Sequence, residues 1–133
     1  MTLPERTREA EDAYLDAWRA SEDTGALLEV IDHAMAERRP MLAARLVGLL
    51  EGRVPIPPGS AAEHAQRAAR FLLHSARDEQ GEWSVVDGAF EDLEAAWAEV
   101  RSDRMRRIRA RQRDALEGKP TRIPRVARRK GKR

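Results

Sequence analysis

The fold is decided most clearly by residues 85–116, which read VVDGAFEDLEAAWAEVRSDRMRRIRARQRDAL. In the first half of this stretch, large apolar side chains recur every three or four residues, at Val86, Phe90, Leu93, Trp97 and Val100. That spacing is the period of one face of an α-helix. The helical register can continue to Leu116, although the apolar face is lost after Val100. We therefore expect one helix of roughly 30 residues, of which only the first half packs into a core.

Four further segments show helical periodicity or capping signals, at about residues 3–21, 25–38, 40–52 and 60–80. The first and the last of these begin with the spacing of a capping box, Thr2 with Glu5 and Ser60 with Glu63. In the last, Phe71 and Leu73 are expected to widen an apolar stripe made mainly of alanines. Strand signals are absent. The predicted fold is therefore all-α, a compact bundle of about five helices, the last one long and projecting into a basic arm.

The charge is divided unevenly along the chain. The 133 residues carry a formal net charge of +2. Residues 1–100 contain 10 basic and 20 acidic side chains, whereas residues 101–133 contain 15 basic and 3 acidic ones. We expect three parts from this distribution: an acidic helical bundle over 1–100, an Arg-rich continuation of the last helix over 101–118, and a disordered basic tail over 119–133.

Composition excludes several classes of protein. The chain has no cysteine, so a disulfide framework and a thiolate metal site are both excluded. No apolar run is long enough for a transmembrane helix, and no secretory signal is visible at the N-terminus. We therefore expect a cytoplasmic protein. Among the 25 basic residues only three are lysines, a bias typical of a GC-rich bacterial genome.

The sequence holds no arrangement of residues that indicates an enzyme. Its three histidines are His33, His64 and His74, and none belongs to a Glu-x-x-His or a His-Glu-x-x-His motif. A Gly-rich phosphate loop and a cysteine nucleophile are also missing. We expect no catalytic residues, no metal and no cofactor.

The basic arm is the one functional signal with a clear physical mechanism. Its guanidinium groups match phosphate oxygens, and a row of them releases the counterions condensed on nucleic acid. The arginines are spread around the helix, and only Gln112 is suited to reading bases. The candidate nucleic-acid-binding residues are Arg101, Arg104, Arg106, Arg107, Arg109, Arg111, Arg113, Arg122, Arg125, Arg128, Arg129, Lys130, Lys132 and Arg133.

Two hypotheses follow from this arm. The first is a non-enzymatic bacterial nucleic-acid-associated protein, which binds the phosphate backbone of DNA or RNA with little sequence specificity. The alternative is a helical adaptor, assembly or regulatory subunit whose basic arm docks on an acidic protein surface, on another protein or on its own bundle. The bundle could also form a homodimer. Binding to a membrane is not expected, because the arm lacks an apolar face.

Overall fold

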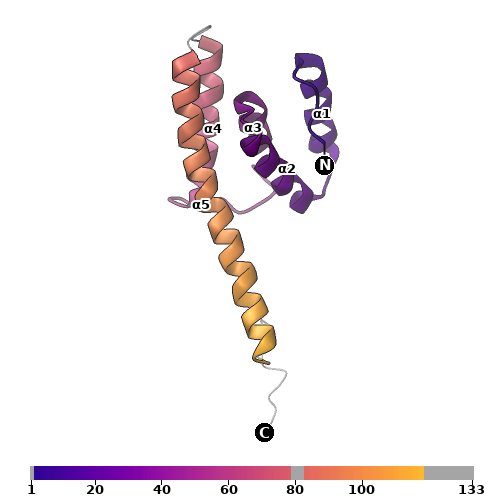
Figure 1. The fold of residues 1–133 in the computed structure, drawn as a ribbon, viewed down its shortest axis with the longest axis vertical. Helices are drawn as coiled ribbons and strands as arrows, with labels where there is room; N and C mark the ends of the chain where they lie inside the picture. Colours follow the sequence, from indigo (N-terminus) through magenta and orange to yellow (C-terminus); the bar gives the residue numbers. More distant parts are fainter. Residues whose placement is uncertain (1, 79–82, 119–133) are drawn as a thin grey trace. The chain divides into compact units, whose positions relative to one another are not determined.

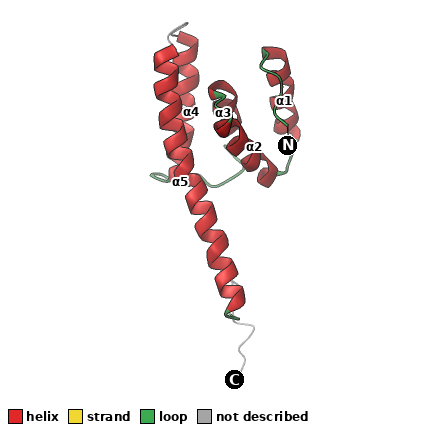
Figure 2. Cartoon of the chain, viewed as in Figure 1, coloured by secondary structure: helices red, strands yellow, loops and turns green. Residues whose placement is uncertain are grey.

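The computed structural model describes residues 2–78 and 83–118 of the chain, and these residues form five helices. They are α1 (Arg8–Ala20), α2 (Thr24–Ala36), α3 (Pro40–Gly48), α4 (Ala61–Asp78) and α5 (Trp83–Leu116), shown in Figure 1. Figure 2 shows no strand in the described part of the chain, which has only an isolated bridge between Glu51 and Val54. The prediction of an all-α fold with a long last helix is confirmed.

The chain divides into two units, Met1–Ala98 and Glu99–Arg133, and α5 runs without interruption across their boundary. The first unit contains α1 to α4 and the beginning of α5. The described part of the second unit is the Arg-rich end of α5 and the two residues that follow it. The predicted disordered tail, residues 119–133, lies outside the described residues.

The first helix begins later than its capping signal predicted. Thr7, not Thr2, is the N-cap residue of α1, and its Oγ1 accepts a hydrogen bond from the amide of Ala10 at 3.1 Å. Residues 2–7 are not helical. The physical reason lies far along the chain, because Arg39 binds the carbonyl oxygens of Pro4 and Glu5. A tertiary contact therefore overrides the local capping signal.

The predicted end of α3 is wrong, whereas the predicted cap at the start of α4 is confirmed. α3 ends at Gly48, and Gly52 lies beyond it in a turn with φ +84°, the left-handed region that suits glycine. At the start of α4, the Ser60 hydroxyl accepts from the Glu63 amide at 3.2 Å, as the sequence predicted. The Glu63 carboxylate accepts its bond from Gly59 rather than from Ser60, at 2.7 Å.

Helix α3 is the centre of the first unit, since it packs against α1, α2 and α4 (Figure 1). Ala65 and Ala69 are buried on α4, and such small side chains let two helices approach closely. The predicted stripe of α5 is buried from Val86 to Trp97. The largest buried side chains of this core are Leu15, Leu27, Val30, Ile31, Leu42, Leu46, Val47, Leu72, Phe90, Leu93 and Trp97.

The prediction that Phe71 belongs to the apolar face of α4 is wrong. Phe71 is 55% exposed, whereas its neighbour Leu72 is completely buried. The buried arc of α4 is centred on Ala65, Ala69 and Leu72, because α3 packs against these residues, and Phe71 lies about 100° away from Leu72 around the helix. Phe71 therefore belongs to the surface of the first unit.

Two polar contacts tie α5 to the region of α2. The indole Nε1 of Trp97 donates a hydrogen bond to Oδ1 of Asp32 at 2.7 Å. The guanidinium of Arg38 lies 5.3 Å from the centre of the Phe90 ring, within the range of a cation–π interaction. The apolar stripe explains why these two aromatic side chains are buried, and the two contacts also orient them.

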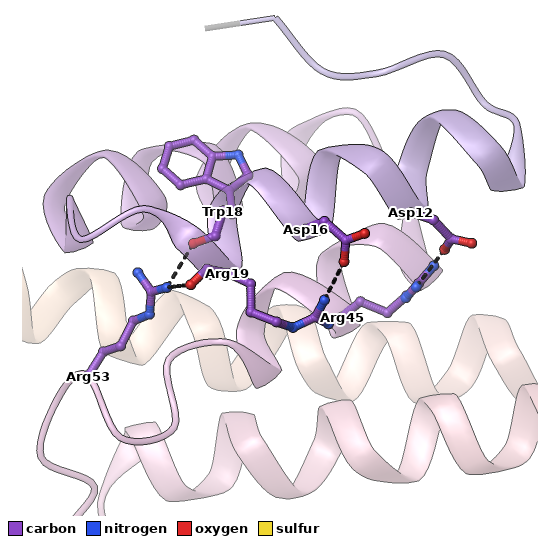
Figure 3. A network of polar contacts seen from close by, with 6 residues as sticks. All are labelled: Asp12, Asp16, Trp18, Arg19, Arg45 and Arg53. Carbon is purple, nitrogen blue, oxygen red and sulfur yellow. Dashed lines mark hydrogen bonds and ion pairs between the residues drawn. The ribbon is translucent and has the colours of Figure 1, made fainter.

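Arginines also connect α1 to α3 and to the loop that follows it. Figure 3 shows Arg45 reaching the carboxylate of Asp12 at 2.7 Å. In the same view, Arg53 donates to the carbonyl oxygens of Trp18 and Arg19, at 2.7 and 3.0 Å. The Trp18 carbonyl, in the last turn of α1, also accepts a bond from the amide of the C-cap residue Ser21 at 3.1 Å, so Arg53 is its second donor.

Candidate nucleic-acid interface

Seven of the predicted site residues lie together on the second half of α5. All of them fall between Arg101 and Arg113, a stretch that is helical throughout. Six of these arginines are exposed, and only Arg104 is half-buried. The structure therefore presents a dense cluster of guanidinium groups on one rigid element.

Helical geometry sorts six of these arginines into two rows. Each residue turns the helix by about 100°, so residues three, four and seven apart lie close to one line. One row consists of Arg104, Arg107 and Arg111, and the other consists of Arg106, Arg109 and Arg113. The rows lie roughly 160° apart around the helix axis. Six of the seven arginines of this stretch thus lie in two opposed rows, and Arg101 lies between them.

The two sides between the rows differ in character. One side is a ridge formed by Arg101, Met105, Ile108 and Gln112, and Met105 is 44% exposed there. The other side carries Asp103 and Asp114. Both carboxylates of this stretch are therefore confined to the side that faces away from the ridge.

Most of the charge in the two rows is available for a ligand. Arg106 pairs with Asp103 within its own helix. By contrast, Arg107, Arg109, Arg111 and Arg113 form no ion pair with any residue in the described part of the chain. Exposed ion pairs contribute little to folding, so these four arginines are charged groups whose contact with a ligand would break no ion pair in the described residues.

The dimensions of this segment suit the groove of a nucleic-acid duplex. An α-helix with its side chains is about 10–12 Å wide, and the major groove of B-DNA is about 12 Å wide. The two rows together extend about 14 Å along the helix axis, from Arg104 to Arg113. That length corresponds to about four base pairs, so phosphates on both walls of a groove lie within reach.

The remaining predicted site residues cannot be placed. The part of the predicted interface that belongs to the tail lies outside the described residues, namely Arg122, Arg125, Arg128, Arg129, Lys130, Lys132 and Arg133. The geometry of the candidate interface rests on the helical arginines alone.

The described residues show no group of three or more acidic or histidine side chains that could hold a metal ion. His33 lies on α2, whereas His64 and His74 lie on the exposed side of α4. None of the helices described combines the length and the apolar character needed to cross a membrane.

Comparisons with protein families, with curated protein sequences and with solved structures found no match to this chain.

Proposed function

We propose that this chain is a non-enzymatic nucleic-acid-associated protein that binds the phosphate backbone through the Arg-rich half of α5. One observation carries the proposal: two rows of exposed arginines lie on opposite sides of one helix, and four of these arginines form no ion pair in the described part of the chain. A guanidinium binds phosphate with a planar fork of donors, and several in a row release condensed counterions.

The arrangement favours insertion into a groove over contact with a single strand. With one row facing each wall, Met105, Ile108 and Gln112 point at the groove floor. Asp103 and Asp114 then point to solvent, away from the phosphates. The major groove of B-DNA admits a helix of this width, whereas that of A-form RNA is too narrow for side chains to read. Duplex DNA is therefore the ligand that we favour.

The same arrangement implies weak discrimination between sequences. Of the ridge residues, Arg101 and Gln112 carry groups that pair with a base edge, and Met105 and Ile108 offer apolar contact to a thymine methyl group. Most of the affinity would come from phosphate contacts, which position a protein without reading sequence. The proposal places the protein in the cytoplasm of a bacterium, with access to nucleic acid.

The proposal is tested by titrating the full-length protein against a short DNA duplex and a short RNA hairpin at 150 mM salt, a condition set near physiological ionic strength. We expect binding at micromolar concentration or tighter, with the duplex preferred. The double variant Arg107→Gln/Arg111→Gln, which removes two of the three arginines of one row, should weaken binding to all sequences. The matched control Asp114→Asn alters the solvent side and should not weaken it.

The alternative function, an adaptor whose arm docks on an acidic protein surface, uses the same arginines without internal partners. The experiment favours this alternative if the full-length protein binds neither the DNA duplex nor the RNA hairpin at micromolar concentration. In that case the nucleic-acid proposal is wrong, because the four row arginines without an ion pair in the described residues should give measurable affinity at this salt when they face phosphate.

A further inference from the structure

A surface of the first unit, distinct from the Arg-rich half of α5, is hollowed at two adjoining places. The larger hollow, of about 660 Å³, lies between the beginning of α1, α3 and α4. The smaller one, of about 580 Å³, lies on α4. Leu73 lines both, so the two hollows adjoin at this side chain, and together they are called the groove. Each volume is within the range of sites that accept several side chains of a ligand.

The groove is apolar at its centre. Phe71 is 55% exposed and Met41 is 36% exposed, and both line it together with Leu73. In the described part of the first unit, Phe71 and Met41 are the large apolar side chains left most open to water. Grouped apolar side chains of this kind mark interaction sites more often than scattered ones do. Methionine also adapts its shape to different partners.

The edges of the groove are cationic. Its lining includes five of the ten arginines of residues 1–100, and these are Arg6, Arg8, Arg45, Arg67 and Arg70. The enrichment is notable because the same 100 residues carry twice as many acidic side chains as basic ones.

The one carboxylate that lines the groove in the described residues does not neutralise these edges. It belongs to Glu11, which is already paired with Arg39 at 2.7 Å. Arg45 is paired with Asp12 and Arg67 with Glu63, whereas Arg6, Arg8 and Arg70 have no ion pair in the described part of the chain. The acidic unit therefore keeps one face on which positive charge surrounds exposed apolar side chains.

We propose that this groove docks an acidic amphipathic helix of a partner protein. An amphipathic helix laid into a groove is read through anchors at positions i, i+3 or i+4, and i+7. Here such anchors would cover Phe71, Met41 and Leu73, while flanking Glu and Asp side chains would face the arginines of the edges. The protein would then bind nucleic acid with one unit and recruit a partner with the other, and the two proposals stand independently.

Other occupants fit this face less well. The Arg-rich segment of the same chain carries positive charge, so the arginines of the groove would repel it. Single-stranded nucleic acid would match the charge, but strand-binding surfaces stack successive bases on several aromatic rings. In the described groove the only rings are those of Phe71 and His74, which lie three residues apart on α4.

The test uses full-length protein and a labelled synthetic helical peptide of about 16 residues, with leucines on one face and glutamates beside them. Two control peptides keep its length. In one, lysine replaces every glutamate, and in the other, alanine replaces every leucine. We expect fluorescence anisotropy to show binding of the first peptide only, since both the apolar anchors and the charge are required.

Variants of the protein locate the site. Phe71→Ala should weaken binding of the peptide at least about tenfold, as expected for a central aromatic anchor. Arg8→Glu/Arg70→Glu should weaken it further, and circular dichroism should show both variants folded because all three positions are exposed. The arm variant Arg107→Gln/Arg111→Gln serves as the matched control and should leave the affinity unchanged.

Three results would overturn the inference. In the first result, the arm variant weakens binding of the peptide and the groove variants do not, which would show that the peptide binds to α5. The peptide without leucines could bind equally well, which would reduce the interaction to charge. In the third result, the acidic peptide does not bind, whereas a thymidine oligonucleotide binds the parent protein and not the Phe71→Ala variant. Nucleic acid would then be the occupant of the groove. None of these results depends on whether the arm binds duplex DNA.

Discussion

Replacement of Arg39 by methionine should destabilise the first unit strongly. Only 6% of this arginine is exposed, and its guanidinium donates to three acceptors in the N-terminal part of the chain. Nη1 lies 2.6 Å from the carbonyl oxygen of Pro4, and Nη2 lies 3.2 Å from that of Glu5 and 2.7 Å from the carboxylate of Glu11. Methionine retains much of the volume of the side chain and removes all three bonds.

The magnitude follows from the burial of the pair. The Glu11 side chain is 17% exposed, so loss of Arg39 leaves a largely buried carboxylate without its counter-charge. Breaking one partner of a buried ion pair costs about 3–5 kcal/mol. In a unit of about 100 residues, each 1 kcal/mol lowers the melting temperature by about 4–8 °C. We therefore expect the melting temperature of Arg39→Met to fall by at least about 12 °C.

Thermal unfolding followed by circular dichroism measures this change, with Arg19→Met as the control. Arg19 also pairs with a carboxylate, that of Asp16 at 2.6 Å, but the two side chains are 60% and 76% exposed. Solvent screens such a pair, so the control should change stability by less than about 0.5 kcal/mol. The double variant Arg39→Met/Glu11→Leu should recover part of the loss, because no charge is then left buried alone. If Arg39→Met melts within a few degrees of the parent protein, the buried pair does not hold the N-terminal segment and the reasoning is wrong.

Other outcomes can be measured with the same protein. Trp97→Ala should cost about 3–5 kcal/mol in urea unfolding, since the indole is 2% exposed, and a cooperative transition near that of the parent would contradict its place in the core. Gln66→Leu should cost about 1–3 kcal/mol, because the Gln66 amide donates to the buried Val47 carbonyl at 2.7 Å; an unchanged midpoint would show that another donor replaces it. For duplex DNA, affinity should fall about 10³–10⁵-fold between 50 and 200 mM salt, and removing one row arginine, as in Arg111→Gln, should lower the slope of log affinity against log salt by about 1; a slope near zero would exclude phosphate neutralisation. Truncation after Gly118 should weaken binding only in part, because the helical arginines remain; complete loss of affinity would place the binding energy in the tail.

Much of the candidate interface could be predicted from the sequence because its signals are local. The Arg-rich segment continues the register of the stripe that ends near Trp97, and a helix needs only neighbouring residues to form its hydrogen bonds. Once that segment is helical, the separation of its arginines into two rows follows from the angle between successive residues. What the sequence left open was whether these arginines find carboxylate partners, which depends on side chains brought near them by folding.

The groove on the first unit could not be predicted, because its arginines come from separate helices. Arg8, Arg45 and Arg70 lie far apart in the chain and line one surface only after α1, α3 and α4 have packed. Phe71 gave a misleading signal, since a phenylalanine beside two leucines is expected inside. Its exposure was decided by which face of α4 meets α3.

The sequence by itself determined the all-helical class, the long last helix and the separation of an acidic part from a basic one. These properties depend on periodicity, capping residues and charge counts, which act over a few neighbouring positions or require no structure at all. Only the tertiary structure decided where α1 begins, which side of α4 is buried and which arginines share a surface. Each of these depends on contacts between residues distant in the chain, such as Arg39 with Pro4, and their free energy outweighs the local preference of a Thr2 cap.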